Sequence, residues 1–102
     1  MSKRYLVRLT DRVRIRVALE VRMNKVVNLV VQLETFLGDW VPVVRYNYAH
    51  GFPHRDLLFA DGKKLKDPVE DQDLGRIATH AIEDLKKNWL QYLRRCGYGT
   101  ED

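Results

Sequence analysis

The stretch RYLVRLTDRVRIRVALEVRM, residues 4–23, alternates apolar and polar side chains almost without a break. Apolar residues take every odd position except Asp11. The polar even positions are Arg4, Arg8, Thr10, Arg12, Arg14, Arg16, Glu20 and Arg22. A period of two is typical of a β-strand with one face in the core and the other in water. Because a single strand of this length would be unusual, we expect two strands with a turn at residues 10–12, or one sharply bulged strand.

The next part of the chain continues the strand pattern. Further strands are expected at residues 26–36, 40–48 and 54–60. The turn signals between and after them are Asn24-Lys25, Gly38-Asp39, a Gly/Pro loop at residues 49–53, and Asp61-Gly62. Pro42 has no amide hydrogen to donate, so its end of the strand should lie at an edge or a bulge.

The chain after Asp67 has the spacing of one amphipathic helix. Asp67 suits the N-cap and Pro68 suits the first helical position, while Gly75 leaves open a start nearer Asp71. Gly97 is a natural stop. We therefore predict an α+β fold in a single domain, residues 1–102. It has an antiparallel sheet of four to five strands over about 4–60, and one long C-terminal helix over about 70–96 packed on one face. The tail at 97–102 is expected to be loose.

Composition narrows the class of protein. The 102 residues are 45% hydrophobic and 31% charged, which is typical of one globular domain with a real core. No apolar run approaches the about 20 residues of a membrane span, and the start lacks a secretory apolar segment. Cys96 is the only cysteine, which excludes an internal disulfide and a cysteine zinc site. We expect a cytoplasmic protein with no membrane partner.

Positive charge is concentrated at the beginning of the chain. The net charge is +4, and residues 1–34 alone carry eight Lys/Arg against three Asp/Glu. Arginine offers a planar fork of donors that suits phosphate. The candidate nucleic-acid-binding residues are Arg4, Arg8, Arg12, Arg14, Arg16 and Arg22. Two alternatives stay open: a well-solvated basic face with no ligand, and an arginine-rich surface that reflects a thermophilic origin.

The segment RYNYAHGFPHRD, residues 45–56, gathers the groups needed for acid–base chemistry on a phosphodiester. Histidine can act as acid or base near neutral pH, and arginine can hold the phosphate. The candidate catalytic residues are His50, His54, Arg45, Arg55 and Tyr46. Gly51 and Pro53 disfavour a helix here, so the four-residue spacing of the histidines is no metal motif, and we predict no metal and no cofactor. The alternative is that His54 and Asp56 form a structural pair and that Tyr46 is a half-buried strand residue.

The same segment resembles a family of small bacterial and archaeal proteins of uncharacterised function. The matching residues are Val31-Gln32-Leu33-Glu34, Trp40, Pro42 to Tyr46, Ala49 to Gly51 and His54 to Asp56. The likeness covers residues 27–62. More remotely, Arg45-Tyr46-Asn47 followed by His54-Arg55 is similar to the signature of TumE-type toxins of toxin–antitoxin pairs. Those toxins also combine a sheet with a helix, although Asp56 stands where a further histidine is often found. The resemblance implies a role directed at RNA.

These observations lead to two hypotheses of different classes; a third, that the loop at residues 50–56 binds a small molecule or a metal, stays open. The first is a small RNA-associated protein with the arginine face on the phosphates; its more specific form is a metal-independent ribonuclease of toxin type. The alternative is a non-enzymatic interaction module, a homodimer or a partner-binding protein, that uses an edge strand and the Trp89/Leu93 end of the helix.

Overall fold

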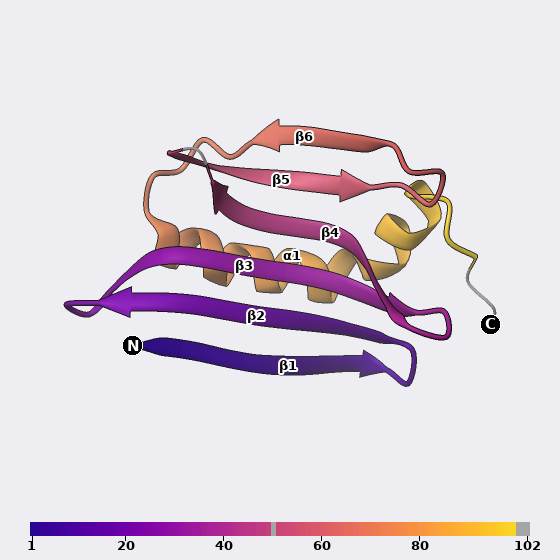
Figure 1. Cartoon of the computed structure of the whole chain (residues 1–102), viewed down its shortest axis with the longest axis horizontal. Coiled ribbons are helices and arrows are strands. Elements are labelled where there is room, and N and C mark those ends of the chain that lie inside the picture. The colour runs from indigo at the N-terminus through magenta and orange to yellow at the C-terminus, as the bar shows by residue number, and fades with distance from the viewer. Residues whose placement is uncertain (50, 100–102) are drawn as a thin grey trace.

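The computed structural model describes residues 1–49 and 51–99, which form one antiparallel sheet and one helix (Figure 1). The strands follow one another across the sheet in chain order. They are β1 (Ser2–Thr10), β2 (Val13–Arg22), β3 (Lys25–Phe36), β4 (Trp40–Ala49), β5 (Phe52–Leu58) and β6 (Lys64–Pro68). The helix is α1 (Leu74–Arg95). The predicted α+β fold is therefore confirmed, with six strands instead of four to five.

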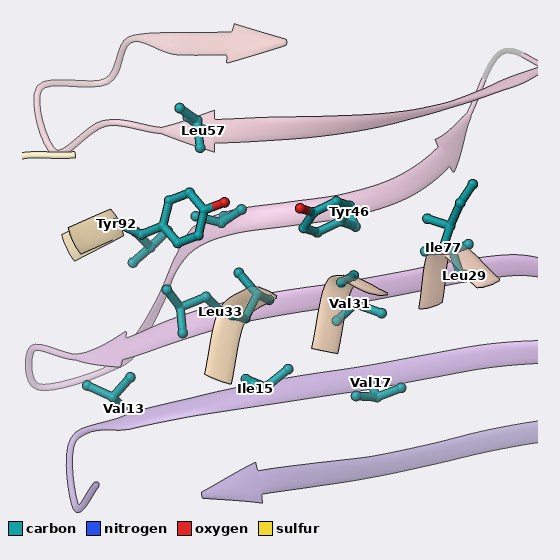
Figure 2. Close-up of a cluster of buried hydrophobic side chains, with 14 of the residues drawn as sticks. Val13, Ile15, Val17, Leu29, Val31, Leu33, Tyr46, Leu57, Ile77 and Tyr92 are labelled. Carbon is teal, nitrogen blue, oxygen red and sulfur yellow. The ribbon is translucent and has the colours of Figure 1, made fainter. Parts of the chain in front are cut away.

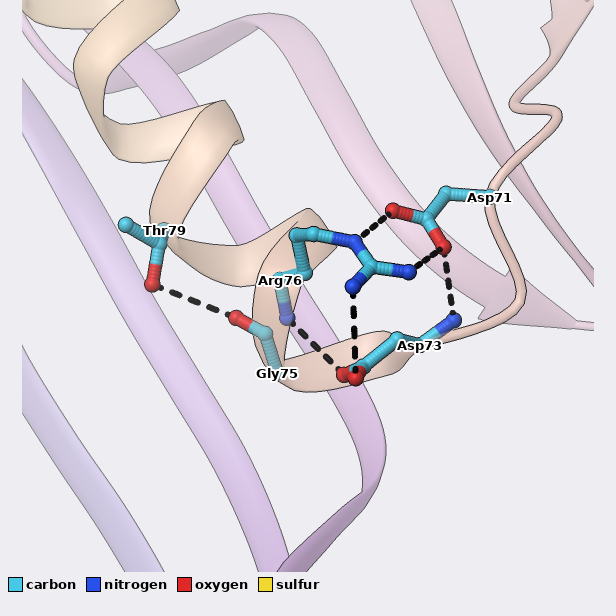
Figure 3. Close-up of polar contacts among 5 residues, drawn as sticks. All are labelled: Asp71, Asp73, Gly75, Arg76 and Thr79. Atoms are coloured by element: carbon cyan, nitrogen blue, oxygen red, sulfur yellow. Dashed lines mark hydrogen bonds and ion pairs between the residues drawn. The ribbon is translucent and has the colours of Figure 1, made fainter.

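The sixth strand replaces what the sequence suggested was the start of the helix. Pro68 lies opposite His54 at the end of β6, instead of in a first helical turn. The helix N-cap is Asp73, whose carboxylate accepts a hydrogen bond from the amide of Arg76 at 3.0 Å. Asp71 braces the same turn through two bonds from the Arg76 guanidinium (Figure 3). The predicted cap at Asp67 was wrong because an equally good aspartate follows six residues later, after a strand that lies at the sheet edge.

The predicted turn between β1 and β2 is confirmed, and the next predicted turn is shifted by one residue. β1 and β2 are separate strands joined at Asp11-Arg12, as the break in alternation suggested. Between β2 and β3 the turn residues are Met23 and Asn24, with φ of 51° and 62°. This places the turn one residue before the predicted Asn24-Lys25. Two successive positive φ values suit the right-handed twist of a hairpin.

The core lies between the sheet and α1. One row of paired apolar residues crosses the sheet on the helix side: Val7, Ile15, Leu33, Val44, Leu57 and Leu65. The helix contributes Ile77, Ala81, Leu85 and Leu93 to the same core (Figure 2 shows part of it). Among the described residues no helix is both long enough and apolar enough to cross a membrane.

The C-terminal end of the described chain is tied to the core, contrary to the loose tail that was predicted from residue 97. The amide of Tyr98 donates to the Leu93 carbonyl at 2.9 Å, and the Tyr98 side chain packs against the core. The Cys96 carbonyl accepts from the amide of Ala60 at 2.8 Å. Residues 100–102 lie outside the described part of the chain.

The opposite side of the sheet, called here the open face, carries a row that is polar from β2 to β6 and begins with a leucine on β1. The row is Leu6, Arg16, Gln32, Arg45, Asp56 and Lys66, each paired with the next across β1 to β6. A bulge in β4 between Pro42 and Val44 shifts the alternation, as the missing amide of Pro42 predicted. Trp40 consequently pairs with Phe36 on the open face, although Val44 and Tyr46 face the helix.

Candidate functional site

The candidate catalytic residues do not form one cluster, because strand alternation sends them to opposite sides of the sheet. In the β4–β5 pair, Arg45 lies opposite Asp56, Tyr46 opposite Arg55, and Asn47 opposite His54. Tyr46 and Arg55 thus face the helix, while Arg45 and His54 lie on the open face. His50 lies outside the described residues. The sequence suggested one site with Tyr46, Arg55 and His54. In the structure Tyr46 and Arg55 lie on one side of the sheet and His54 lies on the other.

The helix-side group connects the helix to the sheet. The Asp84 carboxylate accepts hydrogen bonds from the hydroxyls of Tyr46 at 2.7 Å and Tyr92 at 2.5 Å. Arg55 donates to the Tyr92 hydroxyl at 3.1 Å and to Asp67 at 2.8 Å. Burial, then the hydrogen bond to Asp84, raises the pKa of Tyr46 far above its ordinary value. A phenol held this way keeps its proton, so the group is structural.

His54 and Asp56 lie buried on the open-face side of β5, each 2% exposed. Asp56 Oδ2 lies 3.9 Å from His54 Nε2, 3.6 Å from Lys64 Nζ and 3.2 Å from Asn47 Nδ2. The His54 ring lies against Phe52, with centroids 5.6 Å apart. Within residues 1–49 and 51–99, no group of three His, Cys, Asp or Glu side chains is placed to hold a metal ion. This burial leaves no room for a phosphodiester beside the His54 ring.

A second buried polar group on the open face is built around Glu34, which is 4% exposed. Its carboxylate accepts from Arg14 Nε at 2.7 Å, Arg16 Nε at 3.1 Å and Gln32 Nε2 at 2.6 Å. Gln32 in turn accepts from Arg45 Nε at 2.6 Å. We call these five residues the Glu34 network; they come from β2, β3 and β4.

The Glu34 network presents arginine donors in a fixed arrangement. Each of its three arginines uses Nε for the network, and in the described part of the chain none of their Nη atoms makes a hydrogen bond. The Arg14 guanidinium also lies 3.9 Å above the Trp40 ring. The Nη pairs are therefore free to bind an anion, and the guanidinium groups to which they belong are already held in place by the network.

The network keeps a net positive charge. Burial of Glu34 opposes ionisation, but the hydrogen bonds from Arg14 and Gln32 and the charge of Arg16 outweigh it and lower the pKa of Glu34. One ionised carboxylate then stands against three guanidinium groups. Because the cluster lies on a sheet face that no other element covers in the described structure, this excess charge is available to a ligand.

A groove of about 520 Å³ runs along this network across β1 to β4. Its cationic lining is Arg4, Arg16 and Arg45, and its neutral polar lining includes Asn28, Gln32 and Asn47. Glu20 is the only carboxylate in the lining, and it already accepts a hydrogen bond from Ser2 at 2.8 Å. In residues 1–49 and 51–99, no carboxylate lies within ion-pair distance of Arg4 or Arg45. The groove is thus shaped and charged for an anion with hydrogen-bonding groups.

Most of the predicted nucleic-acid-binding arginines gather on this face. Arg4, Arg8, Arg14 and Arg16 lie on the open face of β1 and β2. Arg22 is exposed at the far end of β2, and Arg12 is exposed in the β1–β2 turn, away from the groove. Arg45 was a catalytic candidate and instead belongs to the groove. Gln32 and Glu34 were missed, although polar residues on the alternate face of a mostly apolar strand, adjacent to an arginine-rich strand, were a usable signal.

Comparison with known proteins gives a family and no activity. Residues 1–100 match the sequence model of a family described as a domain of unknown function, DUF7718. No curated protein and no solved structure matches the chain.

Proposed function

Because the chain belongs to the DUF7718 family, whose function is unknown, we propose a function from the geometry of the site alone: the protein binds single-stranded RNA along its open face. The observation that carries this proposal is the groove lined by Arg4, Arg16 and Arg45, in which the last two are held through Nε and keep their Nη atoms free. The expected cytoplasmic location is consistent with such a ligand and is part of the proposal.

The charge and geometry of the groove support phosphate as the first ligand group. A guanidinium presents paired donors that match two phosphate oxygens. Three such groups, on β1, β2 and β4 around one groove, suit a chain of phosphates better than one small anion. Arg14 and Arg8 extend the positive surface along the same face.

The neutral lining supports a single strand over a duplex. In the described structure Asn28 Nδ2 and Asn47 Oδ1 make no hydrogen bond within the protein, so they offer a donor and an acceptor of the kind that read the edges of unpaired bases. Trp40 and Phe36, on the same face, supply aromatic surface at the end of the Glu34 network. RNA offers these groups the 2′-hydroxyl as a further partner, which is the reason for preferring it to DNA.

Burial favours binding over cleavage. A general acid or base must reach the reacting oxygen at hydrogen-bond distance. His54 is 2% exposed, and Tyr46 and Arg55 face the helix. The proposal is therefore a binding protein, and the ribonuclease hypothesis becomes an outcome of the test: recovered RNA that has been cut would revive it.

The test is fluorescence anisotropy with a labelled RNA of about 12 nucleotides, the matching single-stranded DNA, and an RNA duplex, at about 50 and 200 mM salt. The variant Arg4→Gln/Arg45→Gln removes two groove cations. The variant Arg94→Gln/Arg95→Gln removes two exposed arginines from the last turn of α1 and is the matched control.

We expect the wild type to bind the single-stranded RNA most tightly and to lose affinity with salt. The groove variant should bind at least about tenfold more weakly, with a log–log salt slope reduced by about 1.4 for two lost phosphate contacts. The affinity of the control should stay within about twofold of the wild type, because Arg94 and Arg95 lie on α1, outside the groove. Absence of RNA binding at low salt, or equal weakening by both variants, would overturn the proposal.

A further inference from the structure

The two edges of the sheet are built differently. β6 is a short edge of five residues that includes Lys64, Lys66 and Pro68. Both edges carry charged residues, but brevity and proline, two usual means by which an edge avoids pairing with another strand, are found at β6 alone. β1 is nine residues long and has no proline. Within the described structure it pairs only with β2, so its outer edge is a free template for another strand.

The hydrogen-bond phase of β1 shows which of its backbone groups point outward. Met1 and Val21 exchange both backbone bonds, at 2.9 and 2.8 Å. In an antiparallel pair such positions alternate with positions whose N–H and C=O point away from the partner. With the register Ser2 opposite Glu20, the outward-facing residues are Ser2, Arg4, Leu6 and Arg8. Four residues thus present regularly spaced donors and acceptors at the edge.

The middle of this edge is also apolar and exposed. Tyr5 is 45% and Leu6 55% exposed, on opposite sides of the strand. In Figure 1, α1 lies behind β3 and β4, and β1 extends beyond it. The helix-side surface of β1 is therefore left without a covering element where Tyr5 stands.

We propose that β1 pairs antiparallel with β1 of a second copy of this chain, about a two-fold axis at Tyr5. A two-fold axis perpendicular to the sheet keeps each residue opposite one on the same face, so the axis must pass through a residue. With the axis at Tyr5, Arg4 lies opposite Leu6 of the second copy and Ser2 opposite Arg8 of the second copy. Each of these pairs joins outward-facing backbone groups, and none sets like charges directly opposite each other.

The neighbouring register is disfavoured by charge. An axis at Leu6 would place Arg4 directly opposite Arg8 of the second copy, twice in the dimer. Like charges directly opposite on one sheet face are destabilising. It would also bring Thr10 into the ladder, beyond the irregularity between Arg8 and Thr10. The Tyr5 axis is therefore the register that the sequence of β1 selects.

The pairing would complete the candidate site. Ser2 lines the groove, so Arg8 of the second copy would stand at its mouth and add a cation. A smaller hollow of about 320 Å³, whose lining includes Arg4, Leu6, Arg14 and Arg16, lies over β1 and β2 beside this edge. The two grooves would then form one surface across twelve strands. This last consequence rests on the proposed function; the pairing itself does not.

The pairing is tested in the absence of RNA by sedimentation equilibrium. The wild type should show twice the chain mass of 12.0 kDa. Leu6→Pro removes an outward amide that β2 does not use, and proline is tolerated on an edge strand when its nitrogen faces solvent. This variant should be monomeric with an unchanged far-ultraviolet circular dichroism spectrum. The matched control Leu6→Thr keeps the amide and should remain dimeric. A monomeric wild type at every concentration reached, or a dimeric Leu6→Pro protein, would overturn the proposal.

The register is tested by disulfide crosslinking. At the Tyr5 axis the two Cα atoms of residue 5 would be about 4.5 Å apart, which is within disulfide reach. Residue 6 would lie diagonally from its equivalent, at about 8 Å and out of reach. Tyr5→Cys should therefore crosslink under oxidation and Leu6→Cys should not; the reverse pattern would overturn the Tyr5 axis. Cys96 is 1% exposed, so the wild type gives the background.

The outcome is separable from RNA binding. Arg4→Gln/Arg45→Gln keeps every backbone group of β1 and should sediment as a dimer even though it loses RNA affinity. A dimer that ignores RNA would refute the proposed function alone, and a monomer that binds RNA would refute the pairing alone.

Discussion

Replacing Glu34 by glutamine removes the negative charge that holds Arg14 and Arg16 on the open face, with almost no change of shape. In the folded protein this carboxylate accepts from Arg14, Arg16 and Gln32 at 2.6 to 3.1 Å. A glutamine keeps one acceptor oxygen and turns its amide nitrogen toward a donor. The change should cost about 1 kcal/mol for each arginine bond whose acceptor changes from a carboxylate to a neutral amide, less for the half-exposed Arg16. A buried donor left unpaired adds about 1 to 3 kcal/mol.

The expected total is about 3 kcal/mol of unfolding free energy, or roughly 12 to 24 °C in Tm for a domain of this size. Urea denaturation followed by circular dichroism measures it. Glu70→Gln makes the same chemical change at an exposed glutamate and should stay within about 0.5 kcal/mol.

The pH dependence gives a second measurement of the same contact. The pKa of Glu34 is lowered in the folded protein, so its ionised form stabilises the fold above its ordinary value of 4.5, and this contribution is lost as pH falls through the lowered value. The stability difference between wild type and Glu34→Gln should be constant from neutral pH down to that ordinary value and shrink below it. A loss under about 0.5 kcal/mol, or a difference that does not change in acid, would refute the reasoning.

Three further changes test the fold. Asp84→Leu leaves two tyrosine hydroxyls without their acceptor and should lower stability by about 2 to 4 kcal/mol in urea denaturation; a loss under about 1 kcal/mol would contradict the helix-to-sheet contact. Met23→Gly relieves a φ of 51° in the β2–β3 turn and should raise stability by about 0.5 kcal/mol, whereas a loss would argue against that turn geometry. Asp73→Ala removes the cap of α1 and should lower stability by about 1 kcal/mol in thermal unfolding, and a similar effect from Gln72→Ala would contradict a capping role.

Most of the strands were predictable because apolar and polar side chains alternate along them. Residues 4–23 gave two strands and the face on which the arginines lie, and Pro42 marked the bulge in β4. β6 was not predictable in the same way. Lys64–Pro68 has a single large apolar residue, Leu65, and its pairing with β5 comes from position at the edge instead of from its own pattern.

The candidate site was predictable in its residue types and not in its grouping. Histidine, arginine and tyrosine within a dozen residues suggested one cluster, but neighbours on a strand point to opposite faces, so Tyr46 and Arg45 serve different sides of the sheet. The link from Arg45 through Gln32 to Glu34 joins positions far apart in sequence. Only the pairing register of β3 with β4, and of β2 with β3 for Arg14 and Arg16, brings the network together, and a single sequence does not state that register.

The order of the strands has a consequence for how the chain acquires its structure. Each strand pairs with the one made just before it, so every hairpin can close while the chain is still being synthesised. The core is different, since the apolar row on β3 is covered by a helix that begins only at Leu74. A nascent chain from which β1 to β6 have left the ribosome would therefore carry a folded sheet whose apolar face is not yet covered by α1. The late arrival of α1 makes that interval the time at which this protein is most open to aggregation and to chaperone binding.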